Sequence, residues 1–194
     1  MTDPASRVYD FVLRGVLTDE ALDRAGRSNS AALDMEEAAV AEVLSLRLLD
    51  DRLVADAQKM AIVYTVIAAF ENSVRELVRG VLLEAKGEGW WTDAVSEKVR
   101  QRAEKRQQDE DKARWHTQRG TDPIYYTAMA DLVNIMRNSF DLFEPYVRSI
   151  DWVANIFDAI ERSRNVIMHS GTLEAGDVER LGIYVRDWIK QVGA

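Results

Sequence analysis

The stretch VYTVIAAFENSVRELVRGV, residues 63–81, decides the fold class of this chain. Its apolar side chains recur at spacings of three and four, the period of one face of an α-helix. They are Val63, Val66, Ile67, Phe70, Val74, Leu77 and Val81. The pattern predicts a long central helix from about Asp51 to Lys86, which the turn Gly87-Glu88-Gly89 ends.

The remaining chain follows the same helical period, with three prolines and no alternating β-branched run bounded by turns. We expect a basic helix that opens at Trp90, and further helices over about 125–137, from 149 or 151 to near Gly171, and over about 175–192. Gly171 suits the left-handed residue that follows a helix. Residues 6–49 predict short helices broken near 26–30. The sequence thus predicts an all-α helical bundle over 51–194, preceded by a helical appendage at 1–50.

Composition narrows the class of protein. A chain of 194 residues with 47% hydrophobic content can bury one sizeable core. The absence of cysteine excludes disulfides and thiol catalysis and suits a reducing compartment. No apolar run approaches the roughly 20 residues of a membrane span, and Met1-Thr2-Asp3-Pro4 does not resemble a secretion signal. We expect a soluble, cytoplasmic protein without a cofactor, because the sequence also lacks metal-binding spacings such as HExxH.

Charge is unevenly distributed along the chain. The net charge is −8, yet residues 98–119 hold eight basic and four acidic side chains, so this strip is +4 and the remainder is −12. Such a strip could contact an RNA backbone, although a charge run on a helix is often only a solvated face. The candidate RNA-binding residues are Lys98, Arg102, Lys105 and Arg106. Trp115 and His116 lie in the same strip and would either stack on a base or, for Trp115, anchor a helix to the core.

The helix near the C-terminus carries an anomaly. Arg164 falls inside its apolar stripe, where a guanidinium is costly unless it is paired or lies in a cleft shared with another chain. The stripe consists of Val153, Ile156, Phe157, Ile160 and Ile167. Glu71 on the central helix is the candidate carboxylate partner. The alternative for Glu71 is a simple pair with Arg75, four residues away on the same helix.

His169, one of two histidines, lies five residues after Arg164. An always-charged guanidinium and a group that titrates near neutral pH suit the handling of a phosphodiester. On an ideal helix the two side chains are about 140° apart, whereas Asn165 and His169 share a face. Arg164 and His169 would meet only if the helix loosens before Gly171 or if two copies pack across a dimer.

At these residues the chain resembles the HEPN superfamily of nucleotide-binding helical domains. The hallmark R-x-x-x-x-H, with a polar residue after the arginine, is matched by Arg164-Asn165-Val166-Ile167-Met168-His169. The chain is most similar to a bacterial branch with a Phe-Glu-Asn-x-x-Arg helix, matched by residues 70–75, and a Trp-Trp pair after a glycine turn, matched by residues 89–91. That branch often has a tryptophan where this chain has Phe140. The resemblance runs from about Asp51 to the C-terminus.

The resemblance implies a homodimer with a composite cleft that acts as a metal-independent RNA endonuclease, of the kind found in toxins and phage defence. It implies that His169 exchanges the proton and Arg164 holds the phosphate, while Asn165 orients either group. Glu71 and Arg75 would fix Arg164. RNA and a second copy are the expected partners, and an antitoxin or regulatory protein is a further candidate.

Two other functions compete with the nuclease. In the first, a non-catalytic HEPN dimer uses the same residues to bind RNA or a nucleotide and regulates a partner, which the acidic overall charge favours. In the second, the protein is a structural helical adaptor that binds no RNA.

Overall fold

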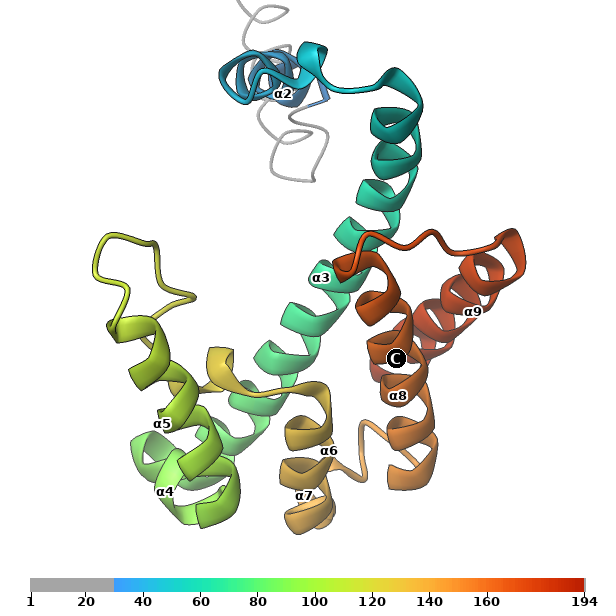
Figure 1. Ribbon diagram of the computed structural model, residues 1–194. Coiled ribbons are helices and arrows are strands. Elements are labelled where there is room, and N and C mark those ends of the chain that lie inside the picture. The colour runs from blue at the N-terminus through green and yellow to red at the C-terminus, as the bar shows by residue number, and fades with distance from the viewer. Residues whose placement is uncertain (1–29, 194) are drawn as a thin grey trace, which may run out of the picture. The chain divides into compact units, whose positions relative to one another are not determined.

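The computed structural model describes residues 30–193 (Figure 1), and these form helices and connecting segments with no strand among them. The all-α prediction is therefore confirmed for this part of the chain. The expected helices before residue 30, and most of the expected break at 26–30, lie outside the described residues. The chain divides into two compact units after Ala55, close to the expected domain boundary and inside a continuous helix.

The first unit contains helix α2, Ser30–Val43, and a short 3₁₀ helix, Leu46–Leu48. Ser45, which joins them, adopts a left-handed backbone with φ of 55°. Asp50 then starts helix α3, because its carboxylate accepts hydrogen bonds from the backbone N–H groups of Arg52 and Leu53 at 3.0 and 3.2 Å.

Helix α3 spans Asp51–Lys86, the bounds expected from its apolar period, and Gly87 with φ of 67° ends it. Its buried face differs from the expected stripe at three positions. Val66 is 40% exposed, and Leu77 and Val81 are only half-buried. The face that is buried consists of Met60, Val63, Ile67, Phe70, Glu71, Val74, Val78 and Leu82. In the second half of α3 the buried positions therefore lie about one residue later in the sequence than the predicted ones, as Val78 and Leu82 replace Leu77 and Val81.

The stretch Asp51–Ala94 is long and apolar enough to cross a membrane by length and composition alone, contrary to the expectation that no run reaches that length. Its most apolar window has a mean hydropathy of 1.5 and is 22% buried. A single helix of this kind is weak evidence for a membrane span, because mostly buried core helices of soluble proteins and signal sequences near an N-terminus meet the same criteria of length and composition.

Two of the expected helices are interrupted. The basic helix is divided into α4, Trp90–Ala94, and α5, Glu97–Asp111, because Val95 is extended between them. The helix expected over 125–137 is replaced by a 3₁₀ helix, Pro123–Tyr126, and α6, Met129–Asn138. A carboxylate accepts a backbone hydrogen bond at the N-terminus of each of these last two helices. Asp122 accepts a hydrogen bond from the Ile124 N–H at 3.0 Å, and Asp131 accepts one from the Ala128 N–H at 3.1 Å.

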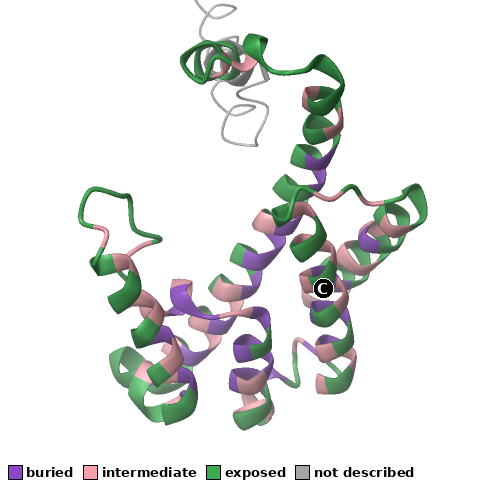
Figure 2. Cartoon of the chain, in the orientation of Figure 1, coloured by how far each residue is buried: buried purple, intermediate pink, exposed green. Residues whose placement is uncertain are grey.

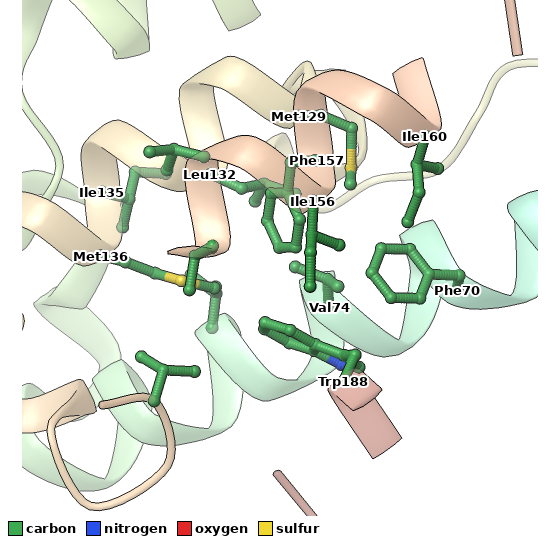
Figure 3. Close-up of a cluster of buried hydrophobic side chains, with 14 of the residues drawn as sticks. Phe70, Val74, Met129, Leu132, Ile135, Met136, Ile156, Phe157, Ile160 and Trp188 are labelled. Carbon is green, nitrogen blue, oxygen red and sulfur yellow. The ribbon is translucent and has the colours of Figure 1, made fainter. Parts of the chain in front are cut away.

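The C-terminal helices pack on α3 and enclose the core. After the short helix α7, Phe140–Phe143, the chain forms α8, Ile150–Met168, and α9, Ala175–Val192, near the expected bounds. Buried residues line α3, α6 and α8 (Figure 2). The rings of Phe70 on α3 and Phe157 on α8 pack edge to face, with their centroids 5.7 Å apart (Figure 3). The ring centroid of Trp188 on α9 lies 5.2 Å from that of Phe157. This packing places Glu71, the residue after Phe70, within reach of α8.

Candidate functional site

Arg164 projects from the half-buried side of α8 toward Glu71 of α3. Its Nε atom lies 3.3 Å from Glu71 Oε1, and the side chains are 36% and 10% exposed. The contact expected from a guanidinium in an apolar stripe is therefore present. The core packing between α3 and α8, which includes the contact of Phe70 with Phe157, holds the two helices close enough for this side-chain contact.

Glu71 also contacts Arg75, so the two alternatives from the sequence occur together. Glu71 Oε2 accepts a hydrogen bond from Arg75 Nη2 at 3.2 Å, and the Arg75 side chain is 12% exposed. Arg75 donates further to Asn72 Oδ1 at 2.9 Å and to the Thr127 carbonyl at 3.4 Å. One buried carboxylate thus lies between two guanidiniums, and the more buried of these is also tied to the segment before α6.

A cavity of about 420 Å³ opens beside this network. Three guanidiniums and one carboxylate line it, a net charge of +2 that falls to +1 when Glu110, the partner of Arg119 outside the lining, is included. Its lining residues are Tyr64, Ile67, Ala68, Glu71, Asn72, Arg75, Arg119, Tyr125 and Arg164. An excess of fixed positive charge in a hollow of this size favours an anionic ligand.

The sequence analysis missed Arg119 and Tyr125 as lining residues. Both lie in the segment between α5 and α6, and Tyr125 reaches α3 by donating a hydrogen bond from its hydroxyl to Glu76 Oε1 at 3.1 Å. This hydrogen bond raises the pKa of Tyr125. Arg79, on the same side of α3, pairs with Asp122 at 3.0 Å. Glu71, Arg75 and Arg79 recur every four residues and so form a polar line on α3, but such a line can face solvent and does not identify the segment that contacts it.

The end of α8 positions His169. His169 is the C-cap residue, and Ser170 after it is the left-handed residue, with φ of 60°. The Ser170 N–H donates to the Ile167 carbonyl at 2.9 Å, and the Gly171 N–H donates to the Val166 carbonyl at 2.8 Å. This pair of hydrogen bonds is a Schellman motif. The expectation that Gly171 itself is left-handed was wrong.

Gly171 is required for a different reason. A Cβ atom on it would lie 2.7 Å from Val166 Cγ1 and 2.8 Å from the Val166 carbonyl oxygen. The absence of a side chain therefore permits the close approach that closes the Schellman motif.

Asn165 and His169 do not join the Arg164 network within one chain. Both side chains are exposed, and neither lines the cavity. Over residues 30–193 the His169 ring has no hydrogen-bond partner, and α8 stays helical through Met168. The helix does not loosen enough to bring His169 to Arg164, so one of the two expected ways for the pair to meet does not occur in the single chain.

Some side chains of the basic strip are exposed to solvent, whereas others form ion pairs that hold two helices together. Arg102 and Arg106 both pair with the buried carboxylate of Asp131, Arg106 at 2.9 Å. Burial opposes ionisation of Asp131, but the hydrogen bonds from Arg106, the Ala128 amide and Arg102 outweigh it and lower its pKa. Lys98 and Lys105 are exposed. Of the four candidate RNA-binding residues, two therefore already link α5 to the start of α6.

No group of three or more His, Cys, Asp or Glu side chains within the described part of the chain is arranged to hold a metal ion. Comparison of the chain with protein-family models, curated proteins and solved structures finds no match.

Proposed function

We propose that the protein is a metal-independent RNA endonuclease of the HEPN type that acts as a homodimer. The observation that carries this proposal is the placing of Arg164, whose guanidinium lines a cationic cavity and contacts the buried Glu71 at 3.3 Å. His169 stands exposed at the end of the same helix. A positioned guanidinium suits a phosphate, and an accessible imidazole suits proton transfer near neutral pH.

In the proposed reaction, the ribose 2′-oxygen attacks the adjacent phosphorus while the bond from phosphorus to the 5′-oxygen breaks. The products are a 2′,3′-cyclic phosphate and a free 5′-hydroxyl. His169 of one copy accepts the 2′-hydroxyl proton, and His169 of the other donates a proton to the departing 5′-oxygen. Each such transfer typically contributes about 10²- to 10⁴-fold. Arg164 stabilises the charge that develops on the phosphoryl oxygens, and Asn165 orients His169 or the phosphate.

The surface beside the motif supports a second copy as the missing part of the site. Arg164 lines the cavity, but His169 is absent from its lining within one chain. Met168, four residues after Arg164 and therefore on the same side of α8, is 55% exposed. Tyr64 on the cavity lining is 39% exposed. Burial of these two side chains against a second copy would bring another α8 end to the cavity.

A non-catalytic dimer is the second candidate, and one observation favours it. The cavity of a single chain presents cations without His169, which is sufficient to bind an anion but not to transfer protons. In that case the same residues hold RNA or a nucleotide, and no bond is broken.

The deciding experiment incubates the purified chain with mixed tRNA and mRNA in excess EDTA and determines the chemistry of the product ends. We expect wild type to leave 2′,3′-cyclic phosphate, and Arg164→Ala and His169→Ala to be inactive. His169→Ala should keep the melting temperature, because the side chain is exposed. Arg162→Ala is the matched control. Its side chain is 78% exposed and pairs only with Asp158 within the described residues, so it should cleave like wild type.

Cleavage by His169→Ala at the wild-type rate would contradict the proposed mechanism. Absence of cleavage by wild type across varied RNAs would instead favour the binding dimer.

A further inference from the structure

The loop between α5 and the 3₁₀ helix carries an unusual tryptophan. Trp115 is 87% exposed, so it does not anchor a helix to the core of its own chain. Its ring lies edge to face with that of His116, with centroids 5.5 Å apart. A large ring that lies in solvent beside a second ring offers a flat face on which a planar ligand can stack.

The loop is tied at both ends, so Trp115 is presented from an organised segment. The His116 N–H donates to the Ala113 carbonyl at 2.9 Å, and Gln118 donates to Asp111 at 2.6 Å. Arg119 pairs with Glu110, and its guanidinium lies 5.7 Å from the centre of the Tyr126 ring. These contacts return the loop to the end of α5.

The charge of the loop favours nucleic acid. Residues 112–119 contain three cations, of which Lys112 pairs with Asp109 and Arg119 with Glu110, whereas Arg114 has no carboxylate partner among the described residues. A ring that can stack on any base, close to a cation that is free to neutralise a phosphate, is the combination that proteins use for single strands.

The loop is also continuous with the candidate site. Arg119 lines the cavity that holds Arg164 and Arg75. Arg119 is the fourth residue after Trp115, so their Cα atoms are at most about 14 Å apart. A strand whose phosphate contacts Arg119 on the cavity lining can therefore place a nearby base against Trp115.

We propose that Trp115, supported by His116 and Arg114, is the base-stacking platform that captures single-stranded RNA for the cavity around Arg164. This inference rests on the proposed function, because it identifies the substrate of that site as unpaired RNA. Trp115 is a binding residue here and takes no part in bond breaking.

The test measures affinity without cleavage. The probe is a fluorescein-labelled RNA of about 12 nucleotides, a typical single-strand site length, with 2′-O-methyl riboses that cannot attack the phosphate. Fluorescence anisotropy compares full-length wild type with Trp115→Ala, Trp115→Phe and Arg114→Ala. We expect Trp115→Ala to weaken binding by about 5- to 150-fold and Trp115→Phe to retain most of the affinity. Arg114→Ala should reduce the slope of log affinity against log salt by about 0.7.

Three results would overturn the platform, and they are distinguishable. Unchanged affinity of Trp115→Ala, with weakened binding by Arg164→Ala, would exclude the loop but leave the proposed function intact. No binding of the probe by wild type would overturn the platform, while cleavage of tRNA and mRNA decides the proposed function separately. A change in sedimentation of Trp115→Ala relative to wild type would identify the loop as a contact with a second copy.

Discussion

Glu71→Gln tests the network that holds Arg164, because it removes a negative charge while keeping the size of the side chain. The carboxylate is 10% exposed and lies between Arg75, which is 12% exposed, and Arg164, which is 36% exposed. After the substitution, Arg75 retains only two neutral acceptors, Asn72 Oδ1 and the Thr127 carbonyl. A nearly buried guanidinium is then left without a counter-charge.

The two contacts of Glu71 differ in strength because they differ in exposure. A hydrogen bond to a charged group, when nearly buried, contributes about 1.5–3 kcal/mol, and this applies to the contact with Arg75. The contact with Arg164 is screened by solvent and contributes about 0.2–1 kcal/mol. We expect Glu71→Gln to lower the free energy of unfolding by about 3 kcal/mol, and Tm by about 6–12 °C in a chain of this size.

Urea unfolding followed by far-UV circular dichroism measures this loss, and two double-mutant cycles divide it. One cycle combines Glu71→Gln with Arg75→Ala, and the other combines it with Arg164→Ala. The coupling energy should be about 1.5–3 kcal/mol in the first cycle and below about 1 kcal/mol in the second. Glu84→Gln is the matched control, because Glu84 is an exposed carboxylate on the same helix without an ion pair among the described residues, and its substitution should change stability by less than about 1 kcal/mol.

Equal coupling energies in the two cycles would refute this reasoning, since exposure would then not decide which guanidinium Glu71 holds. A loss for Glu71→Gln as small as that for Glu84→Gln would refute it as well. Weak coupling to Arg164 is the result that suits the proposed function, because a guanidinium that exchanges a carboxylate for a phosphate must not be held too tightly.

Two further predictions concern stability. The pKa of Asp131 is lowered on folding, so its stabilisation is present above the unfolded carboxyl pKa of about 4 and is lost as pH falls through the folded value. Asp131→Asn should therefore lower the free energy of unfolding by about 3 kcal/mol at pH 7 but much less in acid, as urea titrations at several pH values would show. Gly171→Ala should lower the free energy of unfolding by about 1–3 kcal/mol, because the new Cβ clashes with Val166. Gly80→Ala should raise it by about 0.5–1 kcal/mol, because the space around that Cβ is open. Thermal melts of the two variants measure this contrast.

Local pattern was sufficient where one apolar face runs without interruption. The bounds of α3, α8 and α9 follow from such faces, with caps at Asp50 and Ser149. The pattern was insufficient between α4 and α6, where no glycine or proline marks the breaks at Val95 and at Thr127–Ala128. Asp131 decides the second break by capping α6 while pairing with α5, and a contact between helices far apart in sequence leaves no local signal.

The candidate site was predictable to a similar extent. A cation within an apolar stripe requires a counter-charge, and this physical requirement was enough to indicate Glu71 as the partner of Arg164. Arg119 and Tyr125 could not be placed in this way, because their segment reaches the cavity through the pairs of Glu76 with Tyr125 and of Arg79 with Asp122, more than 40 residues apart in sequence.

Arg164 and His169 are fixed by different means, and this separates their contributions to the proposed reaction. Side-chain contacts with Glu71 hold Arg164 inside the chain. The Schellman motif fixes only the backbone of His169 and leaves its ring exposed. The charge that stabilises the phosphate is thus placed by folding, whereas the group that transfers the proton is directed outward, where a second copy can complete the site. A change at Gly171 should accordingly displace His169 and reduce cleavage while Arg164 keeps its contact with Glu71.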